Sequence, residues 1–270
     1  MSRAVNRHHE ANRQHWDDTL AKVFQDQDDE GGVWRRCVEE QDVAFDCPIL
    51  PLIDELSGSL DGKRVCVIAS GDSHSCFAFA GMGAEVTSVD QSIEQLKTAE
   101  KRAEILGVSI RFVLSDVADM NKVDDESFDL VCSTNGFFVW VSDLGGVFSE
   151  VSRILRPGGH YIFHDIHPFQ RPWGKDMTKL EVERPYGHGE PLHVDGKPAY
   201  SFHWTMSDLL NGLIDSGLTP RRIEERSPKD ASYWEHGKWY LPPEQPDLAD
   251  WKRNPWAALP TWLQVASRKV

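Results

Sequence analysis

The sequence predicts an α/β fold in which helices cover both faces of a mostly parallel sheet. Two observations support this prediction. Between residues 64 and 165, short apolar runs alternate with amphipathic stretches of helical length, which is typical of strand–helix–strand units with parallel strands. The chain is also long enough for such a fold, because 270 residues, 40% of them hydrophobic, can bury one large core.

The first 60 residues are predicted to form a helical N-terminal cap. Their clearest segment has apolar side chains at helical spacing, at Trp16, Leu20, Val23 and Phe24. The turn sequence GSLDG at residues 58–62 ends the cap. Residues 61–270 are therefore predicted to form the main domain.

Five strand-like apolar runs in the main domain predict five strands, at residues 64–69, 84–90, 109–114, 128–133 and 159–165. Two further strands are predicted at residues 219–225 and 261–269. A helix is predicted to begin after Ser92, which forms a capping pair with Gln95, and to end at Gly107. Two further amphipathic helices are predicted at about residues 142–155 and 207–218.

Two long segments, residues 167–204 and 227–260, have no regular periodicity and are rich in aromatic residues. From residue 160 onward the chain holds seven of its 10 tryptophans and seven of its 11 histidines. Exposed loops rarely carry so much aromatic area, and connections of this length are usually functional. We therefore expect both insertions to form a substrate lid at the carboxyl ends of the strands.

Composition favours a cytoplasmic protein with a small-molecule partner. The net charge of −14 argues against a nucleic-acid partner, since a basic face normally supplies most of that affinity. No apolar run approaches the roughly 20 residues that cross a membrane, and the first residues lack the apolar stretch of a secretory signal. The five cysteines form no CxxC pair, so neither a disulfide framework nor a metal site is predicted.

The loop after the first strand, IASGDSHS at residues 68–75, predicts a ligand that contains adenosine but no phosphate. Asp90, which ends the second strand, follows Gly71 by 19 residues, and an acid there can accept hydrogen bonds from a ribose. A pyrophosphate would require bare backbone N–H groups, and Asp72 opposes it. S-adenosylmethionine fits better, because its sulfonium and ammonium groups tolerate a nearby carboxylate.

Two stretches, ESFDLVCSTNGFFVWVSDLGGVFSEVSRILRPGGHYIFHD and FVLSDVADM, resemble the class I S-adenosylmethionine-dependent methyltransferases. The resemblance, to a type 11-like branch that acts on small molecules, covers roughly residues 60–166. It implies a Rossmann-like, doubly wound, seven-stranded sheet of order 3-2-1-4-5-7-6 with the last strand antiparallel. Of the family motif D/E-x-G-x-G-x-G, only the central glycine remains, since the motif positions read Val67, Ala69, Gly71 and Ser73.

The resemblance implies in-line methyl transfer from S-adenosylmethionine to a small molecule. The alternative is a non-catalytic or divergent ligand-binding protein on the same fold, and the acidity disfavours an RNA methyltransferase. Nine residues would bind the cofactor: Ala69, Ser70 and Gly71 at the methionine, Asp90 and Gln91 at the ribose and adenine, Asp116 and Val117 at the adenine, and Thr134 and Asn135 on the methyl side. Asp90 and Asp116 could otherwise be ordinary acids in turns at strand ends.

The segment HYIFHDIHP supplies candidate catalytic residues, His164 and His167, at the expected carboxyl end of the fifth strand. Either could act as a general base, which is needed only if the acceptor must lose a proton, or could contact the substrate. Hydrogen-bonded structural histidines are the alternative, and a metal site of the form H-D-x-H is less favoured.

Aromatic side chains are the candidate walls of an acceptor pocket. The predicted substrate residues are Trp140, Trp173, His203 and Tyr233. Packing of the lid against the sheet is the alternative explanation for each of them. Trp16 could fold over the cofactor or fasten the N-terminal helix to the body.

Overall fold

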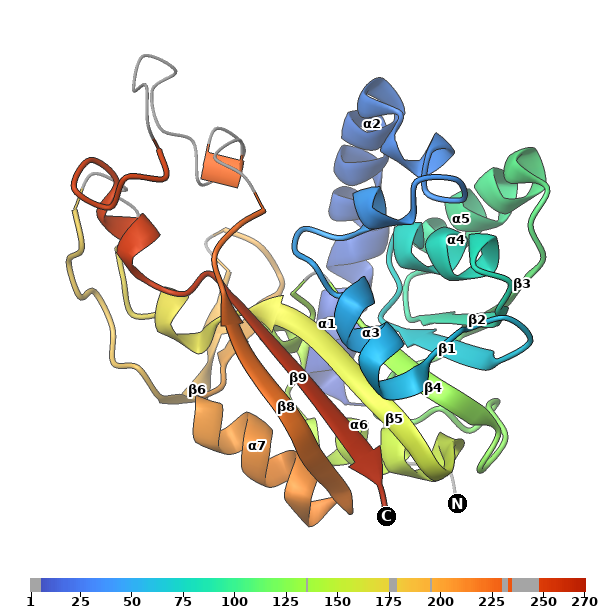
Figure 1. Cartoon of the computed structure of the whole chain (residues 1–270). Helices are drawn as coiled ribbons and strands as arrows, with labels where there is room; N and C mark the ends of the chain where they lie inside the picture. Colours follow the sequence, from blue (N-terminus) through green and yellow to red (C-terminus); the bar gives the residue numbers. More distant parts are fainter. Residues whose placement is uncertain (1–5, 135, 175–178, 195, 230–232, 235–247) are drawn as a thin grey trace.

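A seven-stranded sheet forms the centre of the protein (Figure 1). The computed structural model describes residues 6–134, 136–174, 179–194, 196–229, 233–234 and 248–270. The strands are β1 (Arg64–Ile68), β2 (Glu85–Asp90), β3 (Ile110–Leu114), β4 (Phe128–Ser133), β5 (Leu155–Ile166), β8 (Leu218–Arg226) and β9 (Trp262–Lys269). All seven lie where the sequence predicted a strand.

The strand order is β3-β2-β1-β4-β5-β9-β8, which confirms the predicted order when these strands are numbered along the chain. Strands β1 to β5 are parallel, as shown by the register of Val65 opposite Val86 in β2 and Leu130 in β4. The last strand, β9, is antiparallel to both β5 and β8. Strand β1 therefore lies near the middle of the sheet, and the carboxyl ends of β1 to β5 share one edge.

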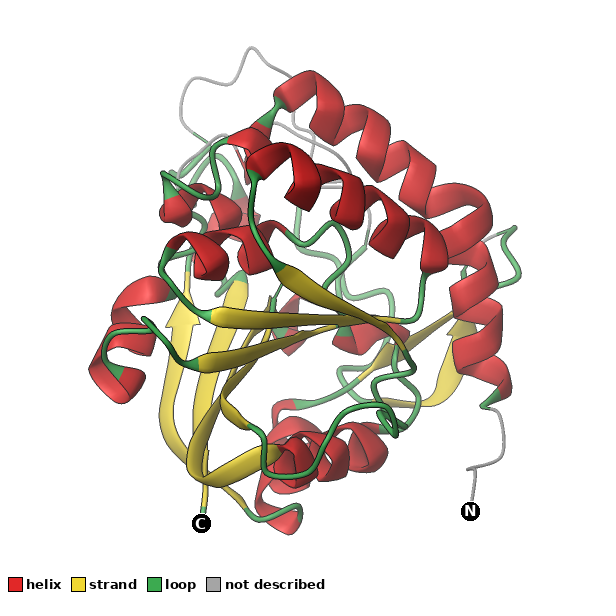
Figure 2. Ribbon diagram, turned by 90° about the vertical axis from the view of Figure 1, so that its right-hand side faces the viewer, coloured by secondary structure: helices red, strands yellow, loops and turns green. Residues whose placement is uncertain are grey.

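Helices cover both faces of the sheet (Figure 2). On one face, α6 (Leu144–Ile154) and α7 (Met206–Asp215) pack on a core that includes Cys66 and Phe163. On the other face, α3 (Leu50–Ser57), α4 (His74–Gly81) and α5 (Ile93–Leu106) pack on a core that includes Val65 and Ile162. Neighbouring residues of one strand enter opposite cores, because strand side chains alternate between faces.

The N-terminal helices form one continuous, bent segment. It consists of α1 (Arg7–His15), the π-helical turn η1 (Trp16–Leu20) and α2 (Ala21–Gly31). The turn η1 contacts α5, and α1 contacts β7 (Tyr200–His203). Among the described residues, no helix combines the length and the apolar character that a membrane crossing requires.

The segment at residues 167–204 contains a hairpin that the sequence did not predict. Strands β6 (His188–His193) and β7 pair antiparallel as a separate two-stranded sheet. The sequence of β6, HGEPLH, contains a glycine and a proline, so it lacks the alternation that predicts a strand. Figure 1 shows the described residues that directly follow β5 and those that directly precede β9 on the left, beyond the carboxyl end of β5.

Candidate functional site

A cavity lies at the carboxyl ends of β1, β2, β3 and β4. Its wall includes eight of the nine predicted cofactor residues, namely Ala69, Ser70, Gly71, Asp90, Gln91, Asp116, Val117 and Thr134. The ninth, Asn135, lies outside the described residues. These eight residues come from four separate loops, and the parallel sheet brings the loops together because each follows the carboxyl end of a strand.

The loop after β1 keeps a glycine-like backbone although two glycines of the motif are replaced. Ala69, Gly71 and Ser73 all have positive φ, at 48°, 52° and 65°. Residues with side chains rarely adopt this conformation, and such strain is concentrated at binding sites. The hydroxyl of Ser88 in β2 lies 2.8 Å from Ser70 Oγ and 3.2 Å from Ser73 Oγ, which holds the loop against its neighbouring strand.

Asp90 joins the β1 loop to the start of α5. One carboxylate oxygen accepts a hydrogen bond from the backbone N–H of Gly71, and the other accepts one from the N–H of Ser92, both at 2.8 Å. Burial raises the pKa of Asp90, and these backbone bonds oppose that rise. Each carboxylate oxygen can accept more than one bond, so the side chain can still accept donors from a ligand in the cavity.

Asp116, at the end of β3, is held by a histidine that the sequence analysis missed. Its two oxygens accept hydrogen bonds from Ala118 N–H at 2.9 Å and from His9 Nδ1 at 2.7 Å. Since His9 Nε2 accepts the N–H of Ser142 at 2.9 Å, the network assigns the imidazole proton to Nδ1. His9 also lines the cavity. Its place in α1 follows no motif, so only the folded chain shows this contact.

Three aromatic side chains, Trp16 and Phe24 of the N-terminal segment and Trp140 after β4, form one side of the cavity wall. Trp16 stacks on Phe24, with ring centroids 5.6 Å apart, and meets Trp140 edge to face at 5.8 Å. All three line the cavity. Trp16 therefore lies where the first of its two predicted roles, folding over the cofactor, would place it. Trp140, a predicted substrate residue, lies against the same cavity as the cofactor residues.

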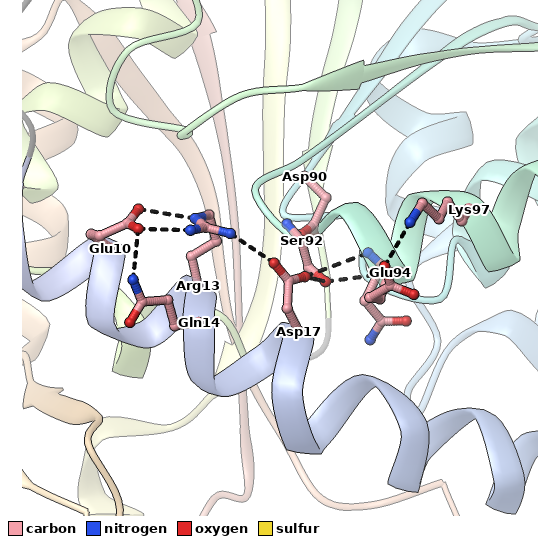
Figure 3. A network of polar contacts seen from close by, with 9 residues as sticks. Glu10, Arg13, Gln14, Asp17, Asp90, Ser92, Glu94 and Lys97 are labelled. Carbon is pink, nitrogen blue, oxygen red and sulfur yellow. Dashed lines mark hydrogen bonds and ion pairs between the residues drawn. The ribbon is translucent and has the colours of Figure 1, made fainter.

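A polar network fastens this aromatic cover to the sheet (Figure 3). Asp17, the residue after Trp16, accepts hydrogen bonds from Ser92 Oγ at 2.6 Å and from Arg13 at 2.8 Å. Arg13 also forms an ion pair with Glu10. Because Ser92 in turn donates its backbone N–H to Asp90, the N-terminal segment and the floor of the cavity share one chain of hydrogen bonds.

The two predicted catalytic histidines do not line this cavity. His164 is buried, with Nδ1 2.7 Å from the thiol of Cys47 and its ring against Trp262. His167 lies 2.9 Å from Glu225 through Nε2 and accepts the N–H of Phe169 through Nδ1. Both positions match the structural alternative, and a catalytic role for either histidine stays a prediction. The described residues contain no group of three or more His, Cys, Asp or Glu side chains that could hold a metal.

The environment of His164 predicts a loss of stability in acid. Burial lowers its pKa to about 4 from the ordinary 6.5, so the unfolded chain takes up the proton first as the pH falls, and stability is lost between those two values. The free energy of unfolding is measured in urea at pH 7 and at pH 4.5. Between these two values it should fall by about 2 kcal/mol less in His164→Gln than in the wild type. The exposed His193, changed to Gln, is the control and should keep the wild-type loss. If both variants lost the same free energy of unfolding between these pH values, His164 would not be the source of the loss in acid.

Asp165, on the opposite face of β5 from His164, is the neighbouring side chain that approaches the cavity. It is 2% exposed and accepts the N–H of Phe138 at 3.0 Å. A β-carbon added to Gly136, which lines the cavity, would lie 3.9 Å from its carboxylate. Burial raises the pKa of Asp165 to about 6. In the sequence Asp165 stands between His164 and His167, the two residues predicted to be catalytic.

The other predicted substrate residues lie in two places. Trp173 and Tyr233 pack on a small apolar cluster of Trp234, Leu248 and Trp256. The ring of Tyr233 also lies 5.5 Å from that of Trp262, which pairs with Ile166 at the carboxyl end of β5. His203 is buried in β7, in the hairpin that contacts α1. The structure therefore brings Trp173 and Tyr233 together in one cluster.

Comparisons with known proteins match the part of the chain that contains the cavity. The family described as "Methyltransferase domain" matches residues 67–163. An uncharacterized methyltransferase, YbaJ, of Bacillus subtilis is 26% identical over 73% of this chain and 86% of its own length. The ubiquinone biosynthesis O-methyltransferase of Pectobacterium carotovorum is 27% identical over 63% of this chain and 71% of its own.

A solved structure supports the same assignment. The S-adenosylmethionine-dependent methyltransferase from Mesorhizobium loti superposes with a TM-score of 0.61 at 26% identity, covering 82% of this chain and 98% of that one. The order of the sheet, the cavity at the carboxyl ends of its strands and these matches show that the chain has the fold of the class I S-adenosylmethionine-dependent methyltransferases and is similar to these enzymes.

Proposed function

We propose that the chain is a cytoplasmic enzyme that transfers the methyl group of S-adenosylmethionine to a small-molecule acceptor. The observation that carries this proposal is the cavity that joins the β1 loop, Asp90 and Asp116 under an aromatic cover. A related O-methyltransferase is named for ubiquinone biosynthesis, which favours a small acceptor. The net charge of −14 disfavours a nucleic acid.

The residues of the cavity fit the nucleoside half of S-adenosylmethionine. Asp90 would bind the ribose hydroxyls, and Asp116 with the N–H of Val117 would bind the adenine. Gln95 also lines the cavity, and its buried side-chain oxygen has no hydrogen-bond partner among the described residues. An unpaired buried acceptor is costly, so a donor from the ribose or adenine would stabilise it.

Asp72 would bind the amino group of the methionine half. The family motif places an acid at position 67, which is a buried valine here. Asp72 lines the cavity in the neighbouring loop, with its carboxylate 3.3 Å from the N–H of His74. A carboxylate beside the cationic end of the cofactor replaces the missing charge from another position.

When bound, the cofactor supplies an electrophilic methyl group, so the protein's own task is alignment and exclusion of water. Trp16 and Trp140 would exclude water from the nucleoside side. Where the acceptor must lose a proton, we propose Asp165 as the base, in place of His164 or His167. A carboxyl group whose pKa is about 6 is ionised at neutral pH. Its pKa is also close enough to neutral pH for the carboxylate to accept a proton effectively.

The proposed division of the chain has three parts. Residues 1–60 would form a cap that closes over the cofactor, and residues 61–270 the methyltransferase domain. The segments at 167–204 and 227–260 would form the acceptor lid. The position of Trp173 and Tyr233 in one cluster beyond β5 supports the lid.

A non-catalytic ligand-binding protein is the second candidate, because Ala69 and Ser73 replace two glycines of the binding loop. Calorimetry with S-adenosylmethionine and S-adenosylhomocysteine, followed by turnover assays on small hydroxyl, amine and thiol acceptors, separates the two. We expect micromolar binding of both nucleosides and methylation of at least one acceptor class. Binding without turnover would favour the second candidate, and the absence of binding would contradict both the cofactor and the enzyme.

A further inference from the structure

The face of α1 that the protein buries is made of polar side chains. It consists of His9, Asn12 and His15, each no more than 4% exposed. Buried polar groups cost free energy unless they form hydrogen bonds. Asn12 forms them with backbone groups, such as the carbonyl of Trp140 at 2.9 Å. His9 reaches a side chain on the wall of the cofactor cavity, Asp116.

His9 links Asp116 to Ser142, in the segment between β4 and α6. Its Nδ1–H donates to a carboxylate oxygen of Asp116 at 2.7 Å, and its Nε2 accepts the backbone N–H of Ser142 at 2.9 Å. Asn6, the N-cap of α1, also binds Ser142, donating to its hydroxyl at 2.7 Å. Because a backbone N–H can only donate, Ser142 keeps the imidazole proton on Nδ1. The ring therefore presents a donor to Asp116.

The second oxygen of Asp116 is also fixed. It accepts the backbone N–H of Ala118 at 2.9 Å, so each carboxylate oxygen has a donor of its own. Two donors from separate elements hold the carboxylate in one orientation at the wall of the cavity. The side chain of Asp116 is 31% exposed and that of His9 only 5%, so the imidazole supports the carboxylate from the buried side.

We propose that His9 sets the selectivity of the cavity for adenine, an inference that rests on the proposed cofactor. A carboxylate only accepts hydrogen bonds, so Asp116 favours a base that presents a donor, such as the 6-amino group of adenine. A 6-oxo group in its place would set one acceptor against another, which costs free energy. His9 acts through Asp116 and is therefore a positioning residue. Without it, the carboxylate would be able to turn away from the base, and this discrimination would be lost.

Calorimetry on the full chain with two nucleosides tests this proposal. S-adenosylhomocysteine carries the 6-amino group, and its deaminated form, S-inosylhomocysteine, carries a 6-oxo group and a hydrogen on N1. We expect the wild type to bind the first at least about thirtyfold more tightly, from the opposed acceptors at Asp116 and the opposed N–H groups at Val117. His9→Phe keeps a ring and removes both nitrogens. It should reduce this preference about tenfold, mainly by weakening S-adenosylhomocysteine binding, and leave the part due to Val117.

Two further variants separate this role from anchoring of the helix. His9→Asn should keep most of the preference, because the amide nitrogen of asparagine lies as many bonds from the backbone as Nδ1 and can donate to Asp116. Asn12→Ala is the matched control. It removes another buried polar contact of the same helix face, and Asn12 is not among the described residues that line the cavity. It should weaken the binding of both nucleosides to the same extent and leave the preference as in the wild type.

Failure of the proposed function and failure of this inference give different results. If the wild type bound no S-adenosylhomocysteine, the cofactor assignment itself would be wrong. Equal binding of both nucleosides by the wild type would show that Asp116 does not select the base. An unchanged preference in His9→Phe would show that His9 only anchors the helix, and either of these two results would overturn the inference. Should His9→Phe not fold, His9→Ala, which adds no bulk, takes its place with the same expectation.

Discussion

Replacing Asp90 by alanine should weaken S-adenosylmethionine binding by ten- to a hundredfold. Hydrogen bonds to a charged group contribute about 1.5–3 kcal/mol each, and each 1.4 kcal/mol corresponds to about tenfold in affinity. The carboxylate also accepts the backbone N–H groups of Gly71 and Ser92. Its loss would therefore release the β1 loop from the start of α5 as well as remove the ribose contact.

Calorimetry with S-adenosylhomocysteine measures this effect. Asp90→Asn should also fail, because an amide has one acceptor oxygen and cannot satisfy both backbone donors. Asp119→Ala is the matched control, since Asp119 follows β3 without lining the cavity and its side chain makes no hydrogen bond with the described residues. An affinity of Asp90→Ala within twofold of the wild type would show that the ribose is bound elsewhere.

The second large effect is expected at Asp17. Asp17→Asn should weaken cofactor binding about tenfold, mainly through faster release, because it removes the charge that joins Arg13 to Ser92 (Figure 3). The hydrogen bonds broken are charge-assisted and partly buried, so about 1.4 kcal/mol is a moderate loss for them. The cover formed by Trp16 would then open more often.

Stopped-flow measurement of cofactor release, followed through tryptophan fluorescence, tests the role of Asp17. Asp18→Asn makes the same change in charge one residue further on, at an exposed side chain, and should release the cofactor at the wild-type rate. If both variants released the cofactor equally fast, the loss of one negative charge would explain the effect. The hydrogen bonds of Asp17 would then not hold the cap closed.

The sequence predicted the sheet well because buried strands carry a local signal. Parallel strands covered on both faces are continuous apolar runs, and the five parallel strands β1 to β5 appeared at the expected residues. The strands β8 and β9 also appeared where they were expected, although β8 is mostly polar and exposed. Their order came from the resemblance to a family, since no local pattern specifies which strands are neighbours. The hairpin of β6 and β7 was missed because glycine and proline interrupt the alternation of β6.

Site residues could be predicted where they stand at or just after the end of a strand. They could not be predicted where their role depends on a contact with a residue distant in the sequence. Asp90 and Asp116 could be placed because they end β2 and precede a turn after β3. His9 and Asp17 could not, because they contact residues 107 and 75 positions away. His164 was predicted to be catalytic, but Asp165, on the opposite face of β5, is the residue that lies near the cavity. Tertiary packing determines which face of β5 borders the cavity.

A crystal structure with S-adenosylhomocysteine tests the central claim most directly. It should show the ribose hydroxyls on Asp90, the adenine between Asp116 and Val117, and the sulfur directed past Gly136 toward Asp165. Trp16 and Phe24 should cover the nucleoside. A nucleoside bound outside the cavity, or one whose sulfur points away from Asp165, would contradict the assignment of both the cofactor site and the acceptor side.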